Sequence, residues 1–179
     1  MTPFDFITGF FAIVFGLALT HILSGAFNLV HRSQADATRL AYAAFLIVTI
    51  TLNWWVAYAW RRHQVWTFDV FLLLVLWTIS FYGNAITLFP PKETGEGGFE
   101  TVRRPFLASF LVMLLLDTAA TATRTGLFSP WYYLLFVGHY ALIAIAALLI
   151  RNEVLQRIAA FWFLGSVLTW SLVVRRLVA

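Results

Sequence analysis

The chain has 179 residues, of which 61% are hydrophobic and 11% are charged, and its mean hydropathy is +0.84. Soluble proteins carry about 25% charged residues, so this composition excludes an ordinary soluble domain and places the chain in a lipid bilayer. The net charge of +4 does not indicate nucleic-acid binding, because the arginines stand singly or in pairs at the ends of apolar runs, where they contact headgroups. The chain has no cysteine, which excludes disulfides, thiol catalysis and thiolate metal sites.

The apolar runs predict an all-α bundle of six membrane-spanning helices that form a single transmembrane domain over residues 1–179. A span needs about 20 apolar residues, so no room is left for a soluble domain. Thr2 as N-cap and Pro3 at the first helical position predict where the first helix begins. The first run is too long for a cleaved signal peptide, and we expect it in the mature protein. The expected helices cover residues 3–30, 40–60, 67–89, 105–123, 130–150 and 158–176.

The segments between the helices carry turn and interface signals. The far end of the second helix is rich in tryptophan and tyrosine, which is typical of the membrane interface. Pro90 and Pro91 end the third helix, because proline cannot extend it. The following segment, 91–104, mixes glycines with glutamates, which predicts a mobile, solvated loop. The fourth helix then begins at Pro105.

Small or polar residues recur at every fourth position of the first helix. Positions four apart stack on one helix face, so this row predicts a smooth strip that packs against other protein. We interpret it as the seam on which the bundle closes, with Gly25 beside it. The row is Thr8, Ala12, Gly16, Thr20, Ser24 and Asn28.

The distribution of lysine and arginine between the loops predicts the orientation. The loops after the first, third and fifth expected helices lie on one side of the membrane and hold seven lysines and arginines. The loops after the second and fourth helices and the C-terminal end lie on the opposite side and hold five. The positive-inside rule then places both termini on the periplasmic side of a bacterial inner membrane.

The six helices divide into three plus three, which favours an inverted repeat of the kind found in transporters. A shift of 90 residues overlays Arg61 on Arg151 and Tyr42 on Tyr132. Aromatic-rich apolar sequences also overlay by chance, so both explanations of this match stay open.

Polar residues inside apolar helices must be hydrated, paired or functional. Asp117 is the most informative of them, because a carboxylate in lipid-like surroundings is either protonated or matched by a donor or cation. Arg124 lies two turns away on the same face, and we expect its side chain to reach outward to the headgroups. The candidates for an intramembrane polar path are Thr20, His21, Ser24, Asn28, Asn53, Asn84, Asp117 and His139.

Each candidate also has a structural interpretation. A histidine can exchange a proton near neutral pH, so His21 suits a proton relay, but it can equally form an interhelical hydrogen bond. His139, beside Gly138, has the same two interpretations. Asn53 and Asn84 are interpreted as interhelical packing contacts, and Asp117 can be satisfied by hydroxyls of neighbouring helices.

Known enzyme motifs are absent from the sequence. There is no glycine-rich phosphate loop, no His-Glu-x-x-His helix and no Gly-x-Ser-x-Gly elbow, so we expect no catalytic residues, no metal site and no cofactor. A remote alternative is a haem held between His21 and His139.

Several stretches resemble a group of small, uncharacterised, multi-spanning bacterial inner-membrane proteins. The resemblance covers about the first two thirds of the chain. It implies an inner-membrane protein and carries over no catalytic residues. The matching stretches are GLALTHILSG at 16–25, the Trp54-Trp55 pair followed by Arg61, WTFDVFLLLV at 66–75, the Leu88-Phe89-Pro90 exit and the acidic glycine loop before Arg103-Arg104.

The sequence therefore predicts a channel- or transporter-like membrane protein with a polar path for an ion, a proton or a small solute. The alternative is an accessory subunit that uses the small-residue row to dock a partner. In both cases we expect a homo-oligomer or a membrane partner protein, with no binding to nucleic acid.

Overall fold

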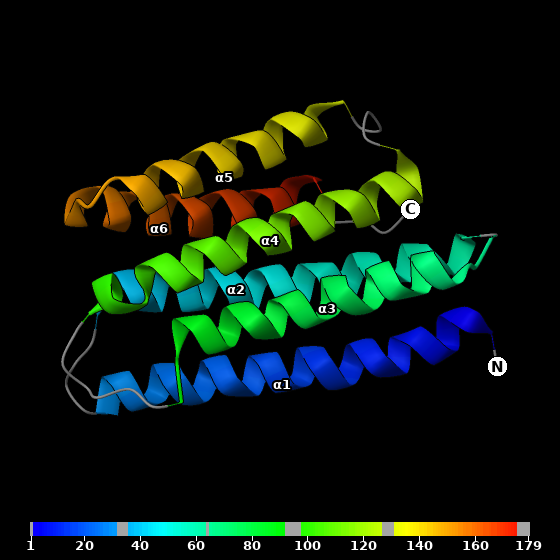
Figure 1. The fold of residues 1–179 in the computed structure, drawn as a ribbon, viewed down its shortest axis with the longest axis horizontal. Coiled ribbons are helices and arrows are strands. Elements are labelled where there is room, and N and C mark those ends of the chain that lie inside the picture. Colours follow the sequence, from blue (N-terminus) through cyan, green and yellow to red (C-terminus); the bar gives the residue numbers. More distant parts are fainter. Residues whose placement is uncertain (1, 32–35, 64, 92–97, 127–130, 175–179) are drawn as a thin grey trace.

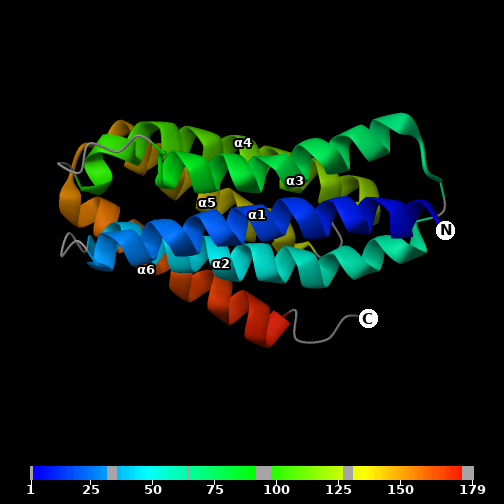
Figure 2. The ribbon, with the colours of Figure 1, turned by 90° about the horizontal axis from the view of Figure 1, so that it is seen from below.

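A computed structural model describes residues 2–31, 36–63, 65–91, 98–126 and 131–174. These residues form six α-helices that lie side by side along one long axis (Figures 1 and 2), which confirms the all-α prediction. A 3₁₀ turn, η1 (Tyr58–Arg62), follows α2, and a π-helical turn, η2 (Trp170–Val174), follows α6. The helices are α1 (Pro3–His31), α2 (Ala37–Ala57), α3 (Phe68–Leu88), α4 (Phe99–Thr125), α5 (Tyr132–Leu149) and α6 (Glu153–Thr169).

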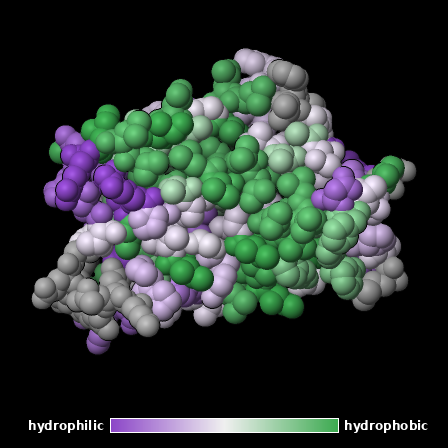
Figure 3. Space-filling model, viewed as in Figure 1, coloured by the Kyte–Doolittle hydropathy of each residue, from purple (hydrophilic) through white to green (hydrophobic). Residues whose placement is uncertain are grey.

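Within the described residues, five helices are long and apolar enough to cross a membrane, and the span that contains α2 continues through η1 to Arg62. The sixth, α6, has 17 residues before η2 begins. The face of the molecule in Figure 3 has an apolar middle and polar residues gathered toward both ends. Large apolar side chains such as Phe27, Leu115 and Leu142 are more than two-thirds exposed, as expected for residues that contact lipid. The chain is therefore a multi-span membrane protein.

The helices pack antiparallel, so the bundle has two distinct ends. We call the end where α1 ends and α2 begins the first-loop end, and the end where α1 begins the N-terminal end. At the first-loop end, α1, α3 and α5 finish while α2, α4 and α6 begin. At the N-terminal end, α1, α3 and α5 begin while α2 and α4 finish. The closest pairs are α3 with α4, α2 with α6, and α1 with α3.

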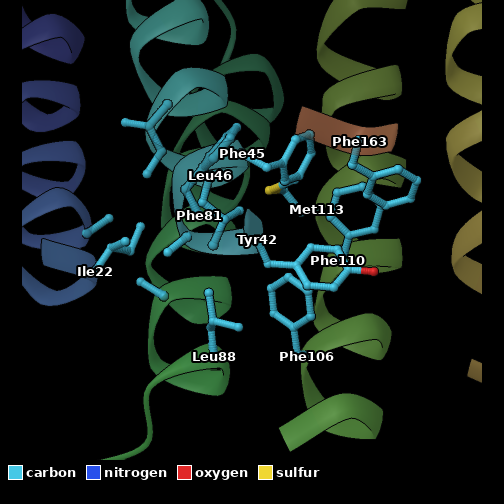
Figure 4. Close-up of a cluster of buried hydrophobic side chains, with 14 of the residues drawn as sticks. Ile22, Tyr42, Phe45, Leu46, Phe81, Leu88, Phe106, Phe110, Met113 and Phe163 are labelled. Atoms are coloured by element: carbon cyan, nitrogen blue, oxygen red, sulfur yellow. The ribbon is translucent and has the colours of Figure 1, made fainter. Parts of the chain in front are cut away.

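Aromatic side chains fill the interior of the bundle near the first-loop end (Figure 4). The ring of Tyr42, which is fully buried, lies 4.9 Å from the ring of Phe106 and 4.8 Å from that of Phe99. Phe110 and Phe163 continue this packing toward the middle, with ring centroids 5.3 Å apart. We call Tyr42, Phe99, Phe106, Phe110 and Phe163 the aromatic plug.

Two helices begin five or six residues earlier than the sequence predicts, and α2 begins three residues earlier. α4 begins at Phe99, so the expected loop 91–104 is wrong for residues 99–104, while 92–97 lie outside the described residues. Pro105 is tolerated near the start of the helix, and the Asp36 carboxylate accepts the Phe99 N–H, which fixes the helix start. α6 begins at Glu153 rather than 158, because the Asn152 side chain accepts the Leu155 N–H as an N-cap at 3.1 Å.

Candidate functional site

A cavity of about 90 Å³ lies inside the bundle between α2, α3, α4, α5 and α6, on the N-terminal side of the aromatic plug. Its walls are mainly aromatic, and a small number of polar groups face it, which is the usual composition of a small-molecule site. The aromatic walls come from Phe45, Trp60, Trp77, Phe81, Phe110, Tyr133, Phe136, Tyr140 and Trp170. The polar residues of the lining that are not aromatic are Thr49, Asn53, Asp117, Thr121 and Arg124.

Asp117 is the carboxylate of this cavity, and it ties three helices together. The Trp77 indole N–H of α3 donates to Oδ1 at 3.0 Å, and the Tyr133 hydroxyl of α5 donates to Oδ2 at 3.3 Å. Both donors are neutral, so these two bonds orient the carboxylate without adding a charge of their own. These bonds hold the Asp117 carboxylate at the wall of the cavity.

Arg124 lies seven residues after Asp117, near the end of α4. Its Nη1 donates to the Val56 carbonyl at 3.1 Å, close to where α2 ends. The expectation that this side chain reaches outward to the headgroups is therefore wrong. The C-terminal end of a helix carries partial negative charge and offers unsatisfied carbonyls, which a buried guanidinium can satisfy.

The predicted polar path is not assembled as one row. Asn53 and Asp117 both line the cavity, and the Asn53 amide donates to the Thr49 carbonyl at 2.9 Å. Beyond Phe45 and Phe110 the aromatic plug fills the interior, so the described residues show no polar passage from the cavity to the first-loop end.

The first three residues of the small-residue row of α1 are half-buried, and the last three do not face the bundle interior. Thr20, Ser24 and Asn28 are exposed, while the buried face of α1 is made by larger residues such as Phe11 and Phe15. The interpretation of this row as the seam on which the bundle closes is wrong for this single chain. The reason is volume, because the bulky face fills the space against α3 and leaves the smooth face outward.

Gly25 and His21 are the parts of this region that contact the bundle. His21 Nε2 lies 2.7 Å from the Phe89 carbonyl just after α3, so this nitrogen is the donor. A Cβ on Gly25 would collide with the Phe89 ring, which shows why a glycine is needed there. His21 therefore makes an interhelical hydrogen bond, as its structural interpretation predicts.

Asn84 and His139 also lie outside the cavity lining. Asn84 is fully buried between α3 and α4, where its amide donates to the Ser80 carbonyl at 2.9 Å and accepts from Ser109 at 3.2 Å. His139 packs against Phe136 and Tyr140 on α5. α1 packs on α2 and α3, whereas α5 packs on α4 and α6 (Figure 1), so His21 and His139 cannot hold one haem within a single chain.

Two arginines are buried at the first-loop end, and the sequence analysis did not single them out. Arg39, 1% exposed, donates to the Leu88 carbonyl from Nε at 3.0 Å and from Nη2 at 2.6 Å. Arg103, 2% exposed, donates from Nη1 to Ala147 and Leu148 at 2.7 and 2.8 Å. Each arginine thus binds the C-terminal carbonyls of a neighbouring helix, α3 or α5, which indicates a structural role.

A spacing of 64 residues would have revealed these arginines. It pairs Arg39 with Arg103, Asp36 with Glu100 and Asn53 with Asp117. The paired residues lie on α2 and α4, which run in the same direction, whereas the halves of the predicted 3+3 repeat would be inverted. The inverted repeat stays a prediction.

Within the described ranges, no group of three or more histidines and carboxylates could hold a metal ion. No protein family model, curated protein or solved structure matches the chain. The case for function therefore rests on the cavity and its charges.

Proposed function

We propose that the protein is a transporter-like membrane protein that binds an organic cation in the cavity around Asp117. The observation that supports this is the position of one carboxylate among aromatic walls. Aromatic faces attract cations, and the attraction reaches about 2 kcal/mol or more when the site is desolvated. A nearby carboxylate adds Coulomb attraction, which is stronger away from bulk water.

Arg124 lines the same cavity and would repel a cation that came close to its guanidinium. Its Nη1 is bonded to the Val56 carbonyl, and Arg124 follows Asp117 by about two helical turns, or roughly 10 Å of helix rise. The arginine charge is thus held toward the N-terminal end of the bundle, and the negative end of α2 partly balances it.

The aromatic plug favours a transporter over an open channel, because it separates the cavity from the first-loop end. Transport would require the plug to part while the N-terminal side closes, as in alternating access. Both termini on the periplasmic side would make the cavity face the periplasm. That orientation and the bacterial inner membrane remain proposals. Arg39, Arg103 and Arg124 bind backbone carbonyls at helix ends instead of headgroups. Without them the loops hold only five lysines and arginines on one side of the membrane and four on the other.

Binding can be tested with benzyltrimethylammonium, a permanently charged aromatic cation, against phenylacetate, an anion of similar size. A ligand at 100 times its Kd stabilises the folded state by about 2.7 kcal/mol, so the thermal midpoint of the purified protein should rise with the cation alone. Asp117→Asn keeps the shape and the Trp77 contact but loses the charge, and should abolish the rise. Equal stabilisation by phenylacetate, or none by the cation, would contradict the proposal.

Transport is tested separately by uptake of radiolabelled benzyltrimethylammonium into proteoliposomes under an inside-negative potential. Wild-type vesicles should accumulate the cation above protein-free vesicles, and Asp117→Asn vesicles should not. Binding without uptake would refute the transport part of the proposal and retain the binding part.

A second candidate function is an accessory subunit that docks through the exposed row on α1. The observation that favours it is the outward position of Thr20, Ser24 and Asn28 on a helix whose opposite face is buried. Ser24→Leu should then disrupt a complex with a second copy or a partner, measured by the mass of the detergent-solubilised species. An unchanged mass, with intact folding, would exclude this role for the row.

A further inference from the structure

A groove runs along the outside of the bundle between α2 and η2. Val48, Thr51, Leu52 and Trp55 form one wall, and Ser171 and Leu172 form the other. Figure 2 shows α6 leaning away from the rest of the bundle as it approaches η2. Leu172 is 68% exposed and Trp55 is 53% exposed, so in a membrane this groove is filled by lipid chains.

The partition between this groove and the cavity is thin. Leu52 lines both of them. Trp170 lines the cavity, and Ser171, the next residue of η2, lines the groove. Leu52 and the η2 backbone therefore lie between the Asp117 cavity and the lipid-facing groove.

The turn that forms this partition is π-helical, a geometry that is rare and often marks functional sites. Its tryptophan packs on α5. The Trp170 ring stacks on Phe136 with centroids 4.0 Å apart and meets the edge of Tyr132 at 5.7 Å. A rotation of Leu52 or a small shift of α2 could therefore open the partition while the α5 contacts stay intact.

The groove also lies beside an aromatic belt. A second shallow hollow, formed by Thr51, Trp54, Trp55 and Tyr58, adjoins it on α2. Tryptophan and tyrosine mark the level of the headgroups, where amphipathic molecules with a charged head and an apolar body accumulate.

We infer that Leu52 and η2 form a lateral portal through which an amphipathic organic cation passes from the bilayer into the Asp117 cavity. This inference rests on the proposed function and narrows the substrate to cations with an apolar body that partition into the membrane. The ammonium head would travel at the level of the aromatic belt and reach Asp117, while the apolar body would pass the leucine.

The portal can be tested by cysteine labelling, because the natural chain has no cysteine. Met113 is buried and lines the cavity, so Met113→Cys places one thiol inside it. Two reagents are compared in proteoliposomes: lipid-soluble N-phenylmaleimide and a water-soluble trimethylammonium methanethiosulfonate. If the cysteine at 113 impairs folding, Thr121→Cys labels the same cavity from the same helix.

Leu52→Trp should then lower the rate of N-phenylmaleimide labelling by about tenfold relative to the rate of the water-soluble reagent, equivalent to about 1.4 kcal/mol in barrier height. Leu115→Trp is the matched control, because Leu115 is 69% exposed on α4 and should not affect either rate. If Leu52→Trp slows neither reagent, or slows both equally, the portal is wrong while the cavity stays accessible. If neither reagent labels the cavity in the parent variant, the proposed binding site fails as well.

Discussion

Arg103→Met removes the charged donor that holds the end of α5, and it should destabilise the protein by about 3 kcal/mol. Arg103 Nη1 makes two hydrogen bonds to the carbonyls of Ala147 and Leu148, and the side chain is 2% exposed. A hydrogen bond to a charged group contributes about 1.5–3 kcal/mol, and the two carbonyls share one nitrogen, so we take the lower value for each.

The loss of Arg103 also removes one of two cations beside Glu100. Glu100 Oε2 lies 3.1 Å from Arg103 Nε, and Oε1 lies 2.8 Å from Arg151 Nε. Arg151 is exposed, so its pair with Glu100 is screened by solvent and should offset little of the loss.

The assay is reversible unfolding in mixed micelles with increasing dodecyl sulfate, followed by far-UV circular dichroism. Arg104→Met is the matched control, because Arg104 is the next residue and is exposed. It should change the free energy of unfolding by less than about 0.5 kcal/mol. Equal effects of the two variants would refute the assignment of Arg103 as a buried cap of α5.

Three further variants test the packing of the bundle by the same assay. Gly25→Ala should cost about 1–3 kcal/mol of stability, because the new Cβ meets the Phe89 ring. Gly16→Ala is the control and should be neutral, because no atom lies within 4 Å of its new Cβ. Equal costs of the two variants would contradict the close approach of α1 to Phe89. Asn84→Leu should cost about 1 kcal/mol, because the two hydrogen bonds between the Asn84 side chain and Ser109 across α3 and α4 are lost, and an unchanged stability would argue against those bonds. Tyr42→Phe should leave the stability unchanged or raise it, because the buried Tyr42 hydroxyl has no hydrogen-bond partner among the described residues; a clear loss would show that the hydroxyl is bonded.

Hydrophobicity and turn residues predicted the fold well, because apolar run length and proline position are local properties of the chain. The six helices follow from them, and most predicted boundaries lie within three residues of the observed ones. The larger errors are at the starts of α4 and α6 and at the end of α6, where the α-helix gives way to η2 after Thr169. Phe99 is held by Asp36 of another helix, a long-range contact that no local pattern near Pro105 contains.

The candidate site was predicted only in part, because residue type does not tell which helix face is buried. Asp117 and Asn53 were expected to matter and do line the cavity. Their neighbours Trp77 and Tyr133 were not singled out from the sequence, although both donate hydrogen bonds to Asp117. Thr20 illustrates the opposite error, since its hydroxyl bonds to the Gly16 carbonyl of its own helix and its side chain stays outside.

The central claim, that the cavity around Asp117 binds an organic cation, is tested most directly by equilibrium binding of radiolabelled benzyltrimethylammonium to the purified protein. The account predicts saturable binding that Asp117→Asn abolishes and that phenylacetate does not displace. Binding of the same affinity to the wild type and to Asp117→Asn would contradict the account, as would the absence of saturable binding to the wild type.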